Sequence, residues 1–366
     1  MPRALALLLG SLALMLAAVS CEAPGGGGGV GGREAAALEP CDDAEALAAW
    51  EAARAALARG DDVAALPRLQ VAVTRCPDLV RAHCAYQDAA RRLGGEAAAE
   101  MVARYTGLEL EGSPLPAYLR ARLAETAYAQ ANELTELLSR HPGFAWGHLS
   151  LARVNRGQGR LSEALSGFGR ALRVTPELHE ARLERGQVLS ELSRNEEAAV
   201  DFRAYLGAQP GDVAAMREFV GLLLYRIGRV DEALQWIDRL AASGDDSVAL
   251  RMDRAAAQWR SGAVRAAVEG YVGVLEEEPG NARAALNVGL LYYEVVPQDD
   301  AGRRRRWPQA RAAFRMFLAG ADASDGHERF ERAWAVPYRL RQIEALLGPA
   351  PTQPPQIAAL RWQQGG

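Results

Sequence analysis

The chain has 366 residues, of which 49% are hydrophobic and 24% are charged, and its formal net charge is -4 at pH 7. It contains no lysine, so its basic side chains are arginines and five histidines. The acidic balance argues against nucleic acid as the main ligand, because binding phosphates needs a basic face. The length allows two ordinary domains or one extended array, and the abundance of Ala, Leu, Arg and Glu favours helices.

The N-terminal segment has the pattern of an export signal. Arg3 precedes an apolar run, 4–19, which has about the length of a signal-peptide core and is short for a membrane span. The sequence Ala18-Val19-Ser20-Cys21 resembles the lipobox of bacterial lipoproteins, although that family prefers Leu where this chain has Ala18. The resemblance implies that residues 1–20 are removed and that Cys21 is lipidated. The alternative is an ordinary secretory signal that releases a soluble protein.

A glycine-rich stretch follows the cysteine. Glycine loses the most conformational freedom on folding, so 21–41 is expected to be a flexible tether, and about 20 such residues reach roughly 25 Å. The lipoprotein resemblance implies a body held at a cell membrane. Glu22 stands where Asp favours inner-membrane retention in enterobacterial lipoproteins, which points to the periplasmic face of a Gram-negative outer membrane.

The body of the chain repeats itself. Between Trp146 and Pro279, small residues, large apolar residues, glycines and prolines recur in register, and the alanines at 164, 198, 233 and 267 are 34, 35 and 34 residues apart. This pattern resembles the tetratricopeptide repeat (TPR), a unit of two helices, A and B, in 34 residues. The resemblance implies an all-α fold, a right-handed superhelical solenoid of antiparallel helix pairs.

Weaker copies of the pattern flank these four repeats, so we expect a solenoid of about seven helix pairs over 42–347. An inserted loop is expected near 297–307, and a C-terminal capping helix at about 328–347 that Pro337 should kink or split. The Pro-rich end, 348–366, is expected to be disordered. Arg303 to Arg306 are read as a solvated part of the loop, with contact to an acidic partner or to anionic lipid as the functional alternative.

Two cysteines fall at opposite ends of the first predicted hairpin. Cys41 precedes its helix A and Cys76 ends its helix B, and these two ends lie side by side in an antiparallel pair. A disulfide between them is geometrically allowed in an oxidising compartment. Cys76 with Cys84 is the rival pairing, and Cys84 can equally be a buried small apolar residue.

We found no spacing of residues typical of an enzyme. The chain lacks the metalloprotease, serine-hydrolase and P-loop motifs, and its histidines are scattered. We therefore expect no catalytic residues, no metal and no cofactor. In the TPR family helix A lines an inner groove, and the carboxylate-clamp residues of one subfamily are absent here. The family's groove positions imply these partner-binding residues, of which we expect about half to be exposed: Trp146, Leu149, Arg153, Arg156, Gln187, Glu218, Tyr225, Arg226, Met252, Trp259, Arg260 and Tyr293.

The sequence thus favours a membrane-tethered scaffold that binds protein partners in its groove and helps to assemble or localise a cell-envelope complex. Exposed aromatic, Met and Arg side chains are the anchors that protein interfaces use. The alternative is a periplasmic or surface binding protein for a small ligand or glycan, with an aromatic groove around Trp146, Tyr225 and Trp259.

Overall fold

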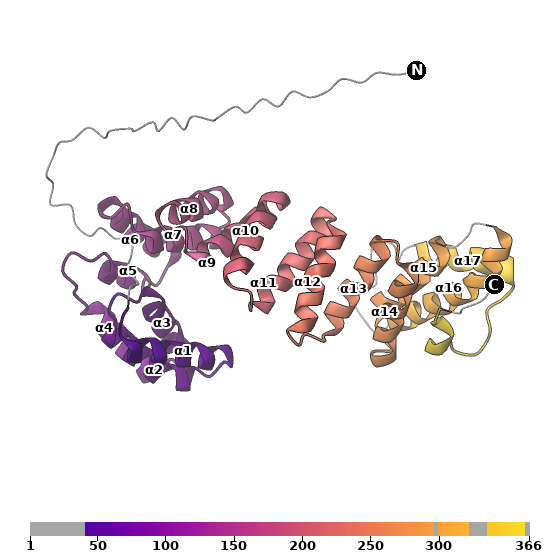
Figure 1. The fold of residues 1–366 in the computed structure, drawn as a ribbon, viewed down its shortest axis with the longest axis horizontal. Coiled ribbons are helices and arrows are strands. Elements are labelled where there is room, and N and C mark those ends of the chain that lie inside the picture. The colour runs from indigo at the N-terminus through magenta and orange to yellow at the C-terminus, as the bar shows by residue number, and fades with distance from the viewer. Residues whose placement is uncertain (1–40, 296–298, 322–334, 363–366) are drawn as a thin grey trace, which may run out of the picture. The chain divides into compact units, whose positions relative to one another are not determined.

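The computed structural model describes residues 41–295, 299–321 and 335–362. The predicted signal peptide, Cys21 and nearly all of the predicted tether lie outside these ranges. Within them the regular elements are all helical, and they form eight consecutive pairs followed by a last helix, where we expected about seven pairs (Figure 1). The predicted fold class, an all-α array of TPR-like helix pairs, is confirmed.

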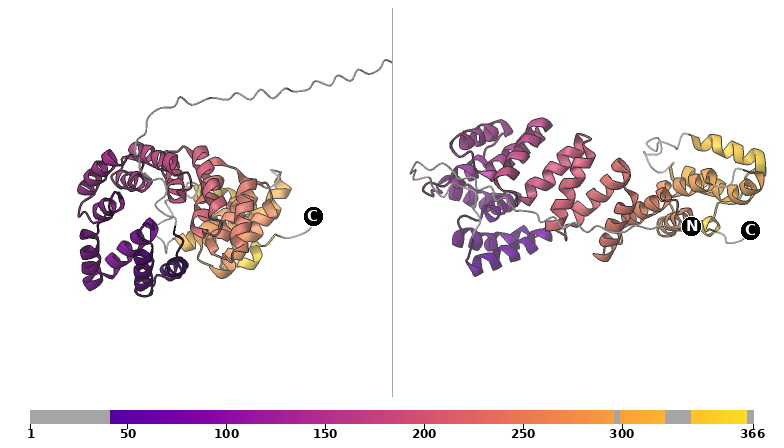
Figure 2. Two further views of the ribbon diagram at one scale, coloured as in Figure 1. Left: turned by 60° about the vertical axis from the view of Figure 1, so that its left-hand side comes forward. Right: turned by 45° about the horizontal axis from the view of Figure 1, so that its top comes forward.

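The pairs are α1 (Ala44–Ala58) with α2 (Asp62–Arg75), α3 (Val80–Leu93) with α4 (Gly95–Thr106), α5 (Leu115–Ala121) with α6 (Ala127–Arg140), α7 (Ala145–Gly157) with α8 (Leu161–Val174), α9 (His179–Glu191) with α10 (Asn195–Ala208), α11 (Val213–Gly221) and its π-helical continuation η1 (Leu222–Ile227) with α12 (Val230–Ala242), α13 (Val248–Arg260) with α14 (Val264–Glu277), and α15 (Ala282–Glu294) with α16 (Asp300–Ala321). Helix α17 (Val336–Leu347) and a 3-10 turn, η4 (Ile357–Leu360), complete the fold. Successive pairs lie side by side along the chain (Figure 2).

Small residues let the two helices of a pair approach closely. A Cβ atom at Gly167 of α8 would stand 2.8 Å from the Cβ of Ala152 on α7, and one at Gly289 of α15 would collide with the ring of Phe314 on α16. The large residues predicted to fill the seams between repeats are buried, as Phe168 and Ile237 show. The repeat pattern therefore follows from the packing of one pair against the next.

Local signals set the helix ends where the pattern predicts them. The side chains of Asp43 and Asp61 cap α1 and α2 by accepting a backbone N–H three residues on. Gly159, in the turn between α7 and α8, has a φ of 74°, a left-handed conformation that glycine adopts without strain.

The predicted loop near 297–307 is a helix over most of its length, because α16 begins at Asp300 and runs for 22 residues. Trp307 explains this difference. It is buried, and its ring stacks on that of Tyr293 on α15 with the two centroids 5.1 Å apart. The guanidinium of Arg303 lies 5.5 Å from the centroid of the Trp307 ring. Aromatic packing therefore draws the arginine run onto the body of the array.

The C-terminal part of the chain also differs from our expectations. Helix α17 begins at Val336, so Pro337 stands in its first turn, where its missing N–H has no partner to lose; residues 328–334 of the predicted capping helix lie outside the described residues. Part of the segment expected to be disordered is packed: Leu360 is fully buried, and the hydroxyl of Tyr292 donates to its carbonyl oxygen at 2.8 Å. Residues 363–366 lie outside the described residues.

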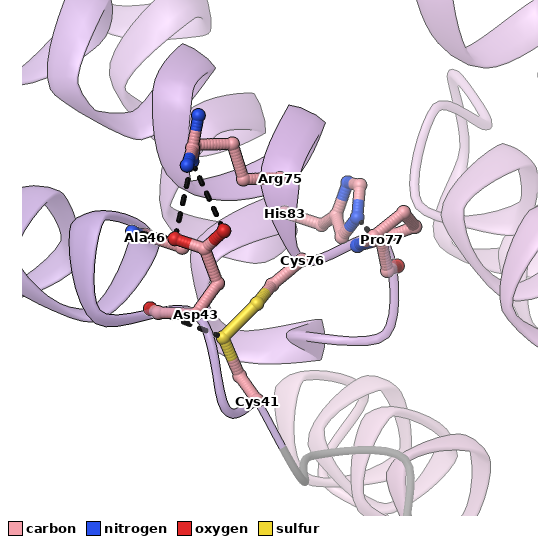
Figure 3. Close-up of a disulfide and its surroundings, with 7 residues drawn as sticks. All are labelled: Cys41, Asp43, Ala46, Arg75, Cys76, Pro77 and His83. Carbon is pink, nitrogen blue, oxygen red and sulfur yellow. Dashed lines mark hydrogen bonds and ion pairs between the residues drawn. A yellow bond between two sulfur atoms is a disulfide. The ribbon is translucent and has the colours of Figure 1, made fainter.

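Cys41 and Cys76 form a disulfide that joins the start of α1 to the end of α2, with their Cα atoms 5.9 Å apart (Figure 3). Beside it the guanidinium of Arg75 binds the carboxylate of Asp43 at 3.1 Å, so the same two helix ends are joined twice. Cys84 is a free thiol whose sulfur lies 3.6 Å from the hydroxyl of Tyr118. The rival pairing is therefore absent.

His83 lies close to this disulfide and is buried (Figure 3). Its Nε2 donates to the carbonyl oxygen of Pro77 at 2.9 Å, so its Nδ1, 2.9 Å from the hydroxyl of Tyr105, is an acceptor in the neutral ring. Burial lowers the pKa of His83 to about 4, against the opposing effect of the Pro77 carbonyl.

In the part of the chain that the structure describes, no helix is both long enough and apolar enough to cross a membrane.

Loss of the disulfide should destabilise the first pair. Cys41→Ser is expected to lower the free energy of unfolding of α1 and α2 by about 2 to 4 kcal/mol, because the bond closes a loop with a sequence separation of 35 residues in the unfolded chain. Amide hydrogen exchange measures this free energy locally. Cys84→Ser, which leaves the disulfide intact, is the matched control. Unchanged exchange of the α1 amides in Cys41→Ser would contradict the prediction.

Acid should weaken the second pair through His83. The pKa of His83 is lower in the folded chain than its ordinary value of 6.5, so between pH 6.5 and about 4 the unfolded chain binds a proton that the folded chain does not. This contribution to stability is therefore complete above pH 6.5 and is lost as the pH falls to about 4. Denaturant unfolding across this range measures how the free energy of unfolding changes with pH. The change should be smaller in His83→Gln than in wild type, and equal changes would refute the assignment.

Candidate functional site

The candidate site is the A-helix face, formed by the first helices of successive pairs. The residues implied by the resemblance come from α7, α9, α11 with η1, α13 and α15, and those that share a helix recur at intervals of three, four, seven or eight positions. That spacing places them on one side of each helix. Because the helices stand next to one another in the array, the same positions of neighbouring repeats meet.

The structure divides these twelve residues by exposure. Trp146, Leu149 and Met252 are buried, and this is a packing role rather than a partner-binding one. A middle group is half-buried: Arg153, Arg156, Gln187, Trp259 and Tyr293. Four residues are exposed, fewer than the half that we expected: Glu218, Tyr225, Arg226 and Arg260. Their part in binding a partner stays a prediction.

Hydrogen bonds between neighbouring A helices account for most of the half-buried group. Arg153 of α7 donates to the carboxylate of Glu184 on α9 at 2.8 Å. Arg156 donates to Gln187 at 2.8 Å, and the amide of Gln187 in turn donates to Glu218 at 2.9 Å. These side chains form an inter-repeat polar ladder, so their polar atoms already have partners within the chain.

One contact on this face joins distant repeats. The guanidinium of Arg81 on α3 binds the carboxylate of Glu180 on α9 at 2.7 Å across 99 residues of sequence, and it lies 5.5 Å from the ring centroid of Trp146 on α7. Burial alone would raise the pKa of Glu180, but the hydrogen bond and charge of Arg81 outweigh it and hold this pKa below its ordinary value. The chain's own side chains therefore cover Trp146.

The A-helix face is more open around the π-helical turn η1. The side chain of Tyr225 is 42% exposed, its hydroxyl donates to the carboxylate of Asp253 on α13, and the guanidinium of Arg260 lies 5.6 Å from its ring centroid. Arg260 also donates to the carbonyl oxygen of Leu224 within η1. Tyr225 is thus a large exposed ring held in a fixed orientation from two sides.

The charges of this region are set by burial. Burial raises the pKa of the Tyr225 hydroxyl, and the side chain of Asp253, which accepts a hydrogen bond from it, acts in the same direction. Burial likewise raises the pKa of Asp253, although the hydroxyl of Tyr225 and the charge of Arg283 oppose it. The hydrogen bond from the Tyr225 hydroxyl to the side chain of Asp253 orients the ring.

Sequence reasoning missed several residues of this face. Asp253 is one, and Arg81 and Glu180 of the long-range contact are two others. A one-letter pattern holds no signal for a contact across 99 residues. The π-helical turn is equally silent in the sequence, yet π-turns inside helices often stand at functional sites.

The family model for the tetratricopeptide repeat matches the chain twice, over residues 149–213 and 183–248. Residues 149–248 of the chain are therefore tetratricopeptide repeats. No curated protein sequence matches the chain. Because the two matches fall on the region with the most regular spacing, they agree with the helix pairs from α7 to α12.

Several solved structures resemble this TPR protein at low identity. MamA from Desulfovibrio magneticus RS-1 is 17% identical, with 45% of this chain and 92% of that chain covered and a TM-score of 0.38. YrrB, described as a TPR protein with an unusual peptide-binding site, is 18% identical (59% and 94% covered, TM-score 0.39). PilW, described as a type IV pilus biogenesis factor, is 16% identical (55% and 90% covered, TM-score 0.39). These values are too low to transfer a function.

The described part of this TPR protein brings together no group of three or more His, Cys, Asp or Glu side chains that could hold a metal ion. Its A-helix face offers ion pairs, a fixed aromatic ring and arginine side chains. Such groups bind another surface and hold it in register.

The contact between Arg81 and Glu180 should be energetically coupled. A double-mutant cycle with Arg81→Ala and Glu180→Ala is expected to give a coupling energy of about 1 kcal/mol in the free energy of unfolding, the upper range for a pair that keeps some exposure. The exposed pair of Arg194, which precedes α10, and Glu197 on α10 is the control, for which we expect weaker coupling. Equal coupling in both pairs would show that the long-range contact is not formed.

Proposed function

We propose that this TPR protein is a membrane-tethered scaffold that binds a protein partner at the open part of its A-helix face. The observation that carries this proposal is Tyr225, an exposed ring oriented by Asp253 and Arg260 before any partner arrives. Preorganised aromatic and arginine side chains are the residues that most often dominate protein interfaces, because little conformational entropy is lost when they bind.

The neighbouring exposed side chains define the kind of surface that would fit. Arg260 places positive charge over the Tyr225 ring, Arg226 is an exposed residue that follows Tyr225 in η1, and Glu218 lies one turn before η1. A partner segment with an apolar side chain against Tyr225 and an acidic group toward the arginines would be complementary to this surface.

We further propose that the protein is anchored by lipid at Cys21 and acts on the periplasmic face of the outer membrane of a Gram-negative bacterium. The lipobox-like sequence 18–21 and the glycine-rich stretch after it support anchoring. The disulfide between Cys41 and Cys76 supports export, because structural disulfides persist in oxidising compartments. Two or three acyl chains make a stable anchor, and a single chain does not.

In this proposal the protein is a noncatalytic adaptor that assembles or localises a cell-envelope complex. The tether would let the array reorient above the membrane while its A-helix face engages the partner. A glycan-binding role has less support, since it required an aromatic groove that included Trp146, and that ring is buried beneath Arg81.

Crosslinked, detergent-solubilised membranes provide the test. Tyr225→Ala should reduce recovery of the co-purified partner about tenfold or more, because truncation of an interface hot spot costs about 2 kcal/mol or more. Tyr128→Ala is the matched control, since Tyr128 is 74% exposed on helix α6, on the B side of its pair. Its partner recovery should match that of wild type.

Cys21→Ser separates anchoring from partner binding. It should move the chain to the soluble fraction and lower partner recovery, while the purified variant still binds the same partner in solution. Wild-type protein that carries no lipid and stays in the soluble fraction would refute the anchoring proposal. Partner recovery that Tyr225→Ala leaves unchanged would refute the proposed binding surface.

A further inference from the structure

A second surface of the molecule, on the side of the B helices, already holds a peptide. The docked segment, which we define as residues 356–362, contacts the B helices α14 and α16 through η4 and reaches Tyr292 of α15. Leu360 is its fully buried anchor, and its carbonyl oxygen accepts the hydroxyl of Tyr292. The ring of Trp362 stacks on the ring of Tyr292 with centroids 5.8 Å apart.

The approach to this groove is bound through its backbone. On α16, Arg311 donates to the carbonyl oxygen of Gly348 at 3.1 Å, and Arg315, one turn later, donates to that of Pro351 at 2.8 Å. Bonds to carbonyl oxygens do not depend on the side chains of the bound peptide. Helix α16 therefore presents a general means of holding an extended chain.

The far end of the groove is selective for side chains. The guanidinium of Arg361 binds Glu276 of α14 at 2.7 Å and Glu269 at 3.4 Å. Glu269 also accepts the backbone N–H of Trp362 at 3.2 Å, and the guanidinium of Arg306 lies 4.1 Å from the Trp362 ring centroid. An acidic pair on one wall and an arginine over an aromatic ring on the other select the sequence Leu, basic, aromatic.

A hollow between the B helices α8 and α10 corresponds to the groove between α14 and α16, and it lacks the acidic pair. Leu189 of α9 stands three repeats before Tyr292, and it lines an open hollow of about 340 Å³ with Leu165 of α8 and Val200 of α10. The residues three repeats before Glu269 and Glu276 are Ser166 and Arg173. The gap between B helices thus recurs in the array, whereas this acidic pair does not.

We propose that the groove between α14 and α16 is a peptide-binding site for a partner protein that carries a Leu-Arg-Trp or Leu-Lys-Trp segment, and that the docked segment occupies it in the absence of this partner. The site is separate from the A-helix face. A tethered segment has an effective concentration on the order of millimolar, so a partner must bind more tightly than the docked segment or be concentrated by a second contact.

A labelled peptide with the sequence of residues 353–366 tests the site by fluorescence anisotropy on the full-length chain in detergent. In the variant Leu360→Asp with Trp362→Ala the docked segment should leave the groove, and the peptide should bind with a micromolar Kd. Binding to wild type should be about tenfold weaker or more, because the tethered segment competes.

Charge reversal supplies the specificity control. Glu269→Arg with Glu276→Arg, added to the released variant, should weaken the peptide at least about tenfold, as expected when like charges face each other in a binding site. A peptide with Glu in place of Arg361 should recover binding to that charge-reversed chain. Recovery would tie the affinity to this acidic pair.

Arg361→Glu is a milder way to release the segment, because it leaves Leu360 and Trp362 unchanged, and it serves if the first variant fails to fold. Absence of peptide binding to folded Arg361→Glu would overturn the proposal, as would binding that ignores the acidic pair. Sedimentation provides a further test. If wild type self-associates and the release of the segment abolishes this, the occupant is a second copy of the chain, and the proposed partner is wrong.

Discussion

The close approach of helix A to helix B is the constraint on which the rest of the structure depends. It requires a glycine at 167, where even a methyl group would collide with that of Ala152, and a glycine at 289, where the ring of Phe314 fills the space. A larger side chain at these points would separate the helices and leave the seam to the next pair unfilled. Because each repeat meets the same steric demand, the demand appears in the sequence as a period, and the period carries the fold.

The elements that could be predicted are those governed by local chemistry. Repeat frame, helix ends and the burial of seam residues all follow from steric and capping rules within one pair. The run from Arg303 to Arg306 predicts a loop, since like charges usually indicate a solvated segment, but these residues are helical because the buried ring of Trp307 packs on Tyr293. The segment after Gly348 differs from the prediction for a similar reason. Its prolines predict disorder, but burial of Leu360 against the array holds part of it in place.

The sequence predicted where the candidate site lies, but it did not predict which of its side chains are free to contact a partner. Groove positions alone identified Arg153, Arg156 and Gln187, yet these side chains bond to the next repeat, because identical positions of adjacent A helices are neighbours in space. Whether such a side chain is free to contact a partner depends on the curvature of the array, and this curvature accumulates over many helix pairs. The contact of Arg81 with Glu180 is an outcome of that curvature, and no window of sequence contains it.

The absence of lysine gives the contacts of this molecule a common chemistry. A guanidinium can bond a carboxylate through two parallel N–H groups, donate to a carbonyl oxygen and stack on a ring, whereas an ammonium is a compact point charge. Arg153, Arg311 and Arg306 show these three uses, on the A-helix face and in the groove between the B helices. Because one residue type performs all three, both faces can hold backbone, acid and aromatic groups at once, and this combination is what recognition of a peptide requires. The two faces nevertheless select opposite charges, because Arg260 on the A-helix face suits an acidic group, whereas Glu269 and Glu276 in the groove suit a basic one.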